Sequence, residues 1–283
     1  MPELPEVEVL VRHLAPLLRG KRVRRVVLRR STILRGTTPR ALSKLLTGSR
    51  FSDLNRRGKY LVFGVQTPRS KRPIILLGHL GMTGRMYLQP KKPPIPKHAA
   101  VVLELPQANF VFEDTRYFGT FTLRTGAIDK LGPEPLEHRV PPRSLSQALK
   151  RSGQAIKIKL LDQSLVAGIG NIYASEALFR ARISPRLPAR DLSPQQIDRL
   201  WESIRTVLLE AISFGSTVAL NHSATPSRDG LFYFGRAPDA PNNYEERLQV
   251  YDRFNKPCYQ CGFPIRRIIQ AARSTFYCER CQK

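Results

Sequence analysis

The sequence predicts an α+β protein: a leading helix and an antiparallel β-sandwich come first, helices follow, and a small metal-binding hairpin closes the chain. Three observations support this order. Short β-rich runs broken by Gly, Pro and charge occupy the region from about residue 22 to residue 125. Segments with apolar residues at helical spacing come next, and two C-x2-C pairs lie near the carboxyl end.

Composition indicates a folded protein with an acidic partner. The chain has 283 residues, 41% of them hydrophobic, and 47 Lys and Arg against 22 Asp and Glu give a net charge of +25. The basic residues are spread along the chain rather than gathered on one amphipathic helix, which favours nucleic acid over a membrane. No apolar run approaches the roughly 20 residues that span a bilayer, and the amino terminus does not resemble a secretory signal.

The opening "MPELPEVEVL" places three glutamates at the start of a strongly basic protein. Residues 2–19 have the pattern of a helix, with one apolar stripe formed by Val7, Leu10, Val11, Leu14, Leu17 and Leu18. Pro2 suits the first turn of a helix, and Glu3 and Glu6 would lie near the positive end of its dipole. On residue types alone, this is an ordinary helix start.

The sandwich is predicted from β-rich runs at 23–30, 59–65, 73–80, 99–105, 109–114 and 119–125. A stretch with four prolines, "LGPEPLEHRVPPRS", then indicates a linker. Helices are expected at 144–150, 154–163, 170–182 and 193–213, the last with Ser193 as its cap and Pro194 at its first position.

Between two of these helices, "VAGIGNIYASEALF" combines a glycine-containing turn, an Asn and a helix start, which together suit a DNA phosphate. A tight packing turn is an equally good interpretation of the glycines.

The four cysteines have the spacing C-x2-C-x16-C-x2-C, which is typical of a zinc site. Two disulfides are the alternative, and the lack of a secretory signal disfavours them. The 16 residues between the pairs are basic and rich in β-branched residues, which predicts a β-hairpin that presents arginines to phosphates. One structural Zn²⁺ is therefore expected, with the ligands Cys258, Cys261, Cys278 and Cys281.

Seven blocks in order give the chain a resemblance to the formamidopyrimidine-DNA glycosylase family of bacterial base-excision repair enzymes. They are "PELPEVE", "RRGKYL", "HLGMTGR", "DTRYFG", "LGPEPL", "AIKIKLLDQSLVAGIGNIYASEALF" and "RSTFYCERCQK". The resemblance implies a catalytic β-sandwich domain at 1–130, a linker at 131–143 and a helix-two-turn-helix DNA-binding domain with a lesion-capping loop at 144–247. A zinc-finger hairpin is implied at 248–283.

The family resemblance assigns a catalytic role to the acidic amino terminus. Once the initiator Met is removed, Pro2 is implied to be the nucleophile that forms a Schiff base with C1′ of the damaged nucleotide. Glu3 matches the acid that opens the sugar ring, and Glu6 is an auxiliary residue beside it. Lys59 is implied to assist β-elimination and Arg273 δ-elimination. Without the motif, Lys59 would be interpreted as a solvated surface lysine.

The resemblance also implies DNA contacts. Backbone contacts are expected at His98, Lys157 and Asn171. His79 is a further candidate, although a lone histidine is as often structural. Met82, Arg116 and Phe118 match the trio that fills the duplex after a base is flipped out. Their strand-like pattern alone would instead place Met82 and Phe118 in the core.

Two departures from the family pattern concern the substrate. Tyr117 stands where a second basic residue is common, so one phosphate contact is expected to be missing. Residues 215–247, which are expected to hold the capping loop, are unusually long and lack the common Gly-Gly. The expected activity is excision of 8-oxoguanine and formamidopyrimidines from damaged double-stranded DNA by a cytoplasmic monomer with no membrane association. The alternatives are oxidised pyrimidines, as in the endonuclease VIII group, or binding without catalysis.

Overall fold

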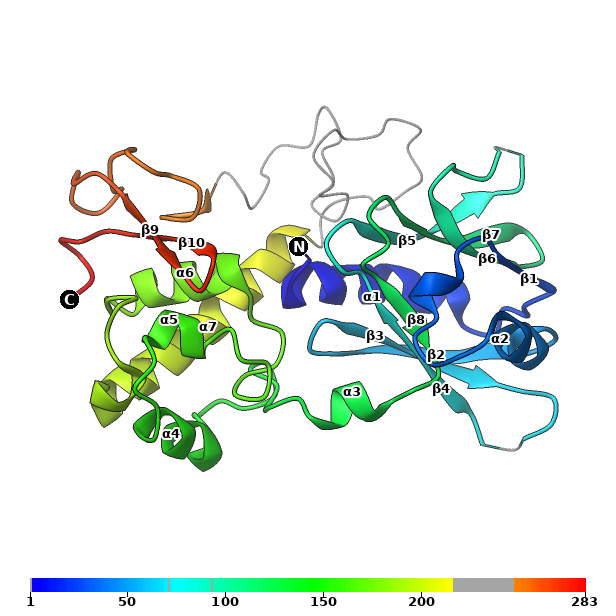
Figure 1. The fold of residues 1–283 in the computed structure, drawn as a ribbon, viewed down its shortest axis with the longest axis horizontal. Helices are drawn as coiled ribbons and strands as arrows, with labels where there is room; N and C mark the ends of the chain where they lie inside the picture. Colours follow the sequence, from blue (N-terminus) through cyan, green and yellow to red (C-terminus); the bar gives the residue numbers. More distant parts are fainter. Residues whose placement is uncertain (1, 71, 93, 216–246) are drawn as a thin grey trace. The chain divides into compact units, whose positions relative to one another are not determined.

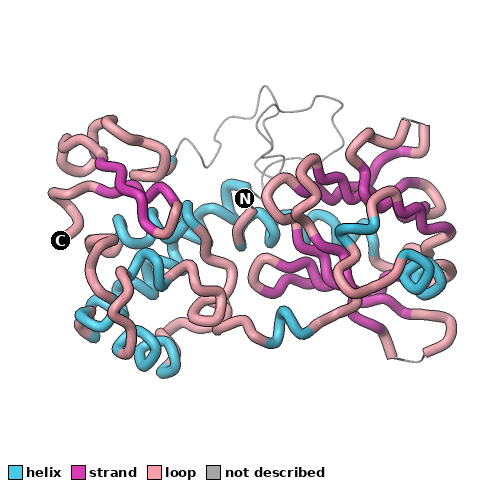
Figure 2. Tube along the Cα trace, viewed as in Figure 1, coloured by secondary structure: helices cyan, strands magenta, loops and turns pink. Residues whose placement is uncertain are grey.

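The computed structural model describes residues 2–70, 72–92, 94–215 and 247–283, which form two compact units (Figure 1). One unit comprises residues 2–129, and the other comprises 130–214 with 247–283. The first contains a leading helix followed in the chain by antiparallel sheets, and the second contains helices and a carboxyl-terminal hairpin (Figure 2). The α+β class predicted from the sequence is therefore confirmed.

Residues 2–129 contain two four-stranded antiparallel sheets. The first has the order β1 (Arg25–Leu28), β6 (Ala99–Glu104), β7 (Ala108–Asp114), β5 (Gly84–Pro90). The second has the order β2 (Arg50–Arg57), β3 (Tyr60–Gln66), β4 (Ile74–His79), β8 (Thr120–Thr122). The short helical elements of this unit are η1 (Ser31–Ile33), α2 (Pro39–Leu46) and α3 (Gly126–Asp129).

One hydrophobic core unites the sheets with the leading helix α1 (Leu4–Leu18). Phenylalanines from both sheets meet in it, and the rings of Phe63 and Phe110 pack edge to face with centroids 5.7 Å apart. Each fully buried side chain of this kind contributes about 1.5–3 kcal/mol relative to exposure. The core therefore fixes the sheets on which the candidate site is built.

Strands β2 and β5 and helix α2 were not predicted from the sequence. β2, "RFSDLNRR", is polar and buries few of its residues, so its apolar signal is weak. α2 is only two turns long and depends on its start: Pro39 occupies the first turn, and the Thr38 hydroxyl accepts a hydrogen bond from Ala41 N at 3.2 Å.

Residues 130–214 with 247–283 contain four α-helices, η2 (Ala189–Asp191) and one hairpin among the described residues. The helices are α4 (Arg143–Lys150), α5 (Ile156–Lys159), α6 (Asn171–Arg180) and α7 (Pro194–Gly215), and the hairpin pairs β9 (Arg266–Gln270) with β10 (Arg273–Tyr277). The helix expected over 154–163 is wrong in length. Ala155 forms a strand-like bridge with Pro188 and Ile156 N donates to Leu187 O, so only one turn follows.

The predicted start of α7 is confirmed. Gln196 N donates to the Ser193 hydroxyl at 3.2 Å, and Ser193 N donates to the Gln196 side chain at 2.9 Å, which forms a reciprocal cap. Inside the helix, Trp201 is buried and donates its indole N–H to His138 O at 2.9 Å. The proline-rich segment is thereby fastened to α7.

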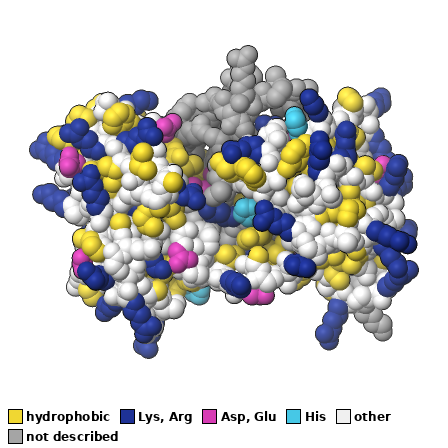
Figure 3. Space-filling view, viewed as in Figure 1, with side chains coloured by type: hydrophobic (Ala, Val, Ile, Leu, Met, Phe, Trp, Pro, Cys, Tyr) yellow, Lys and Arg dark blue, Asp and Glu magenta, His cyan; other side chains and the backbone are white. Residues whose placement is uncertain are grey.

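Lys and Arg side chains are scattered over the visible surface of both units (Figure 3). The described helices include none that is both long and apolar enough to cross a membrane.

Candidate active site and DNA-binding surface

The predicted site residues of the first unit gather at one end of the two sheets. Antiparallel pairing sets the start of β3 beside the end of β4, where Tyr60 pairs with His79, and His79 pairs in turn with Thr120 at the start of β8. In the other sheet, the end of β7 meets the start of β5. Loops at this end carry Lys59, Met82, Arg116 and Phe118, and His98 directly precedes β6.

Pro2 and Glu3 are buried. Glu3 is only 2% exposed, and its backbone N–H donates to a carboxylate oxygen of Glu6 at 2.5 Å. The helix begins at Leu4 rather than at the predicted residue 2, so Pro2 and Glu3 lie before its first turn. A sheltered carboxylate at this position is able to exchange a proton with a bound molecule without competition from bulk water.

An ion pair missed by the sequence analysis joins α1 to the turn that carries Lys59. Arg56 Nε donates to Glu8 at 2.7 Å, and its Nη1 donates to Gly58 O at 3.1 Å. Burial raises the pKa of Glu8, but the hydrogen bonds and charges of Arg56 and Arg12 outweigh it and leave that pKa below its usual value. Glu8 and Arg56 are 48 positions apart in the sequence, which explains why no local pattern revealed the contact.

Lys59 lies in a two-residue turn between Arg57 and Tyr60. Gly58 takes φ +56°, which a glycine adopts without steric cost at the first position of a type II′ turn. The interpretation of Lys59 as a solvated lysine is wrong, since the residue is 7% exposed. The turn therefore presents a cation from a sheltered position.

His79 stays neutral at physiological pH. Burial, and then the positive charges of Lys59 and Arg35, lower the pKa of His79 to about 4. Its Nδ1 accepts a hydrogen bond from Gly81 N at 3.0 Å, which requires that nitrogen to be unprotonated. His79 thus organises the loop that leads to Met82.

Two loops are held together beside His79. Asp114 accepts hydrogen bonds from the Thr83 hydroxyl at 2.6 Å, from Arg116 N at 3.1 Å and from Gly119 N at 2.8 Å. A Cβ on Gly81 would lie 2.6 Å from Gly119 N, so the backbones are in direct contact. The sequence block "DTRYFG" contained Asp114, but residue types gave no sign of this triple contact.

The side chains presented by these loops are exposed. Met82 is 43% and Phe118 49% exposed, so the core interpretation of both residues is wrong. The Arg116 guanidinium lies 4.7 Å from the Phe118 ring centroid, a cation–π contact that holds the two side chains together.

In the second unit, Lys157, Asn171 and the zinc hairpin form one hydrogen-bonded chain. Lys157 Nζ donates to the Asn171 side chain at 2.6 Å, and Asn171 Nδ2 donates to Ser274 O at 2.9 Å. Asn171 begins α6, whose first N–H groups favour an anion. Arg273, the neighbour of Ser274, is exposed at the start of β10.

The four cysteine sulfur atoms lie within 4.8 Å of one another. Cys258 and Cys281 Sγ are 3.9 Å apart, and Cys261 and Cys278 Sγ are 3.5 Å apart. A tetrahedral Zn²⁺ with bonds of about 2.3 Å separates its sulfur ligands by about 3.8 Å. The thiols therefore fit one structural Zn²⁺, which would fix the base of the hairpin and leave no open position for catalysis.

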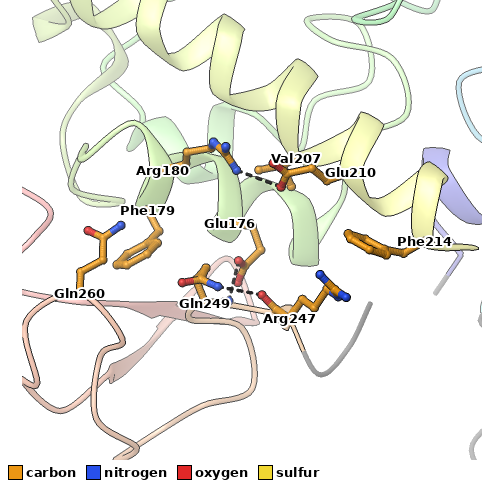
Figure 4. Close-up of a pocket in the computed structure, with 9 residues that line it drawn as sticks. All are labelled: Glu176, Phe179, Arg180, Val207, Glu210, Phe214, Arg247, Gln249 and Gln260. Carbon is orange, nitrogen blue, oxygen red and sulfur yellow. Dashed lines mark hydrogen bonds and ion pairs between the residues drawn. The ribbon is translucent and has the colours of Figure 1, made fainter. Parts of the chain in front are cut away.

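A cavity of about 610 Å³ lies elsewhere in this unit, between α6, α7 and the segment from Arg247 to Gln260 (Figure 4). At its floor, Glu176 accepts N–H groups of Gln249, Val250 and Tyr251 at 2.8–3.0 Å. Burial raises the pKa of Glu176 although these donors oppose the effect. The cavity contains none of the predicted site residues, and Glu176 serves to fasten residues 249–251 to α6.

The lesion-capping loop was expected on residues 215–247, of which 216–246 lie outside the described residues. The basic surface, the buried Glu3 and the four clustered thiols are the features expected of a zinc-containing enzyme that acts on DNA.

Comparison with known families specifies the class. The formamidopyrimidine-DNA glycosylase N-terminal domain matches residues 1–121, the H2TH domain of the same enzymes matches 131–222, and the zinc finger found in FPG and IleRS matches 255–283. The chain belongs to the formamidopyrimidine-DNA glycosylase family.

Individual relatives cover the whole chain. It is 39% identical to the formamidopyrimidine-DNA glycosylase of Thermus thermophilus over 100% of this chain and 98% of that protein, and 40% identical to that of Novosphingobium aromaticivorans over 100% of both. The structure of Lactococcus lactis Fpg (MutM) with DNA containing N7-benzyl-Fapy-dG matches with a TM-score of 0.84 at 31% identity, over 100% of both chains.

Proposed function

We propose that this protein is a bifunctional DNA glycosylase and AP lyase that removes 8-oxoguanine and formamidopyrimidines from duplex DNA. The observation that carries the proposal is the burial of Pro2 and Glu3, where Glu3 is 2% exposed and held by Glu6. The hydrogen bond from Glu3 N to Glu6 belongs to a capping box at the start of α1, so the burial of Glu3, rather than this bond, supports the proposal. Family membership supports the same activity.

The first step uses the amine of Pro2 after removal of Met1. An α-amino group has a pKa of about 7.7–8.0, so a useful neutral fraction exists at physiological pH. The nitrogen attacks C1′ of the damaged nucleotide; the N–C1′ bond forms, the glycosidic bond breaks and the base leaves with a proton. Glu3 protonates the ring oxygen, the sugar opens and the nitrogen lone pair completes an iminium.

Two eliminations then cut the strand without a redox cofactor. Loss of a C2′ proton expels the 3′ phosphate, loss of a C4′ proton expels the 5′ phosphate, and water hydrolyses the iminium to restore the amine. We assign Lys59 to the first elimination because a sheltered ammonium binds and neutralises phosphate charge effectively. Arg273 is assigned to the second, because its guanidinium suits a phosphate group.

Base extrusion requires groups that replace the lost stacking, which costs a few kcal/mol. Met82 and Phe118 are apolar side chains that remain 43% and 49% exposed, which supports a role as wedges. Arg116, stacked on Phe118, is assigned to the cytosine left unpaired. Its planar row of donors fits the acceptors of that base.

We assign contacts with the DNA backbone to His98 in the first unit and to Lys157 and Asn171 in the second. The hydrogen-bonded chain from Lys157 through Asn171 to Ser274 supports a phosphate site that depends on the zinc hairpin. Such contacts act on any sequence and weaken with salt.

A second candidate substrate class is the oxidised pyrimidines. It is favoured by a structure of Lactococcus lactis Fpg with DNA containing an oxidised pyrimidine, which matches this chain with a TM-score of 0.85 at 31% identity over 100% of both chains. The same nucleophile and acid would act on both classes.

The test measures base release and strand cleavage on duplexes with 8-oxoguanine opposite cytosine, an oxidised pyrimidine, or a ready-made abasic site. Excision of 8-oxoguanine at the higher rate is expected. Glu3→Gln should bind damaged DNA and cut the abasic duplex while losing base excision, with Glu104→Gln as the matched control. Tight binding without excision by the unaltered protein would overturn the proposal in favour of damage recognition alone.

A further inference from the structure

Three segments meet at one end of the β1-β6-β7-β5 sheet. Arg30 follows β1, His98 precedes β6 and Tyr117 lies in the loop after β7. Their approach follows from pairing, because β6 is antiparallel to both of its neighbours. Hydrogen bonds extend the pairing beyond the strands: Arg30 N donates to Ala100 O at 3.3 Å and Asp114 N to His98 O at 3.1 Å.

The backbone of Tyr117 directs the three residues of its loop to different surroundings. Its φ is +54°, a left-handed conformation that costs a non-glycine residue about 1–2 kcal/mol. Arg116 and Phe118 on either side are exposed and in contact with each other. The Tyr117 side chain is instead half-buried against the core of the sandwich. Contacts of the Tyr117 ring must therefore offset the strain.

Two of these contacts involve groups that suit a phosphate. The Arg30 guanidinium lies 5.1 Å from the Tyr117 ring centroid, and the Tyr117 hydroxyl lies 3.4 Å from His98 Nδ1. Arg30 is exposed, and no carboxylate of the described ranges forms an ion pair with it. Stacking uses the face of the guanidinium, so the N–H donors along its edge remain directed outward.

We propose that Arg30 is a DNA-backbone contact held in place by the Tyr117 ring, and that Tyr117 is the positioning residue which couples this contact to His98 and to the Arg116–Phe118 loop. The expectation that Tyr117 removes a phosphate contact is thereby replaced: the cation comes from the end of β1 instead. The ligand is a phosphodiester, and the assignment rests on the proposed function only for its identification as DNA.

Charge and geometry together favour a nucleic-acid strand over other anions. Residues 1–129 hold 24 Lys and Arg against 8 Asp and Glu, an excess that suits a polyanion. Arg116 and Phe118, the exposed pair, adjoin Tyr117 directly in the chain. A strand whose base is contacted by that pair would bring its own phosphates past Arg30 and His98.

Duplex binding as a function of salt tests the proposal without any catalytic step. Arg30→Ala should weaken binding of damaged and undamaged duplexes alike and reduce the slope of log K against log salt by about 0.9, the value for one phosphate contact. Tyr117→Leu, which removes the aromatic ring, should do the same. Tyr117→Phe keeps the ring and should keep the slope. Arg40→Ala removes another exposed arginine, in α2, and should leave the slope unchanged.

The double variant Arg30→Ala/Tyr117→Leu decides whether the two residues act together. It should be no weaker in DNA binding than Tyr117→Leu, because the Arg30 guanidinium has already lost its position once the ring is removed. An unchanged slope in Arg30→Ala, or additive losses in the double variant, would overturn the proposal. Because binding to undamaged DNA needs no excision, a failure of the proposed glycosylase activity would leave this result separately interpretable.

Discussion

Lys59 lies in a tight β-hairpin turn and Arg273 directly follows another, and the two turns have different backbone chemistry. Gly58 supplies the positive φ that its turn requires, +56°. The turn before Arg273 consists of Ala271 and Ala272, with φ of +46° and +57°. Alanine pays about 1–2 kcal/mol for each such conformation, whereas glycine adopts it freely.

The surroundings explain why both turns persist. The Lys59 turn is fastened by Arg56, which binds Gly58 O and the buried side of α1. The Arg273 turn is exposed. At the other end of its hairpin, two cysteines before β9 and two after β10 place four thiols that fit one Zn²⁺. A metal that fixes both strands is able to hold a strained turn in place. We infer that packing and hydrogen bonds position Lys59, whereas metal binding positions Arg273.

The largest effect is expected from removal of the metal, which should disrupt the hairpin that carries Arg273 and leave the sandwich that carries Lys59 folded. Cys258→Ser should lose zinc and, with it, most DNA affinity, because structural zinc supplies roughly 10–16 kcal/mol of binding free energy to small modules. Metal content per chain, duplex binding and circular dichroism would be measured. The sandwich signal should persist. Full DNA binding by metal-free protein would contradict a metal-held Arg273.

The next effect breaks the fastening of the Lys59 turn. Arg56→Ala leaves the Glu8 carboxylate without its buried partner and should lower the free energy of unfolding by about 3–5 kcal/mol. Arg12→Ala is the matched control, since Arg12 binds the same carboxylate at 2.8 Å from an exposed position. The control should cost less than about 1 kcal/mol in denaturant unfolding. Equal losses of unfolding free energy in the two variants would show that the buried Arg56 contributes no more to stability than the exposed Arg12.

His79 predicts a pH dependence for the first region alone. Its folded pKa of about 4 lies below the value of 6.5 for an unfolded histidine. Stability is therefore complete above about pH 6.5 and falls between pH 6.5 and 4, where only the unfolded state binds the proton. NMR titration of the ring should show no protonation at pH 5.5. His79→Gln should flatten the stability profile in this window, and an unchanged profile would refute the assignment.

The smallest effects should have opposite signs in the two turns. Ala272→Gly relieves a left-handed alanine and should raise the stability of the zinc-bound hairpin by about 1 kcal/mol, partly offset by the entropy of glycine. Gly58→Ala introduces the same strain into the Lys59 turn and should destabilise the sandwich by a similar amount. Thermal unfolding of both variants with zinc present measures this. Stability changes of the same sign in the two variants would contradict the proposed difference between the two turns.

Local signals made much of the molecule predictable from its sequence. The apolar stripe of α1, the reciprocal cap of α7 and the cysteine spacing each lie within a short stretch. The polar strand β2 and the bridged segment at Ala155 lack such signals, because their conformation depends on partners elsewhere in the chain.

The candidate site shows the same limit. Motif blocks named Glu3, Lys59 and Arg273, yet gave no role to Arg56 or Asp114, whose hydrogen bonds connect separate segments. The left-handed backbone of Tyr117 and its contact with Arg30 also depend on pairing between distant strands. Sequence patterns predicted the residues that are proposed to contact DNA, and the structure shows which residues hold them in place.

Identification of the residue that becomes covalently attached to DNA tests the central claim most directly. Borohydride reduces an iminium to a stable amine, so protein processed to Pro2 should be trapped on an 8-oxoguanine:C duplex. Protein that retains Met1 should not be trapped, because its Pro2 nitrogen is an amide with a delocalised lone pair. Peptide mass spectrometry should place the adduct on Pro2. An adduct on Lys59, or equal trapping with Met1 retained, would contradict the account.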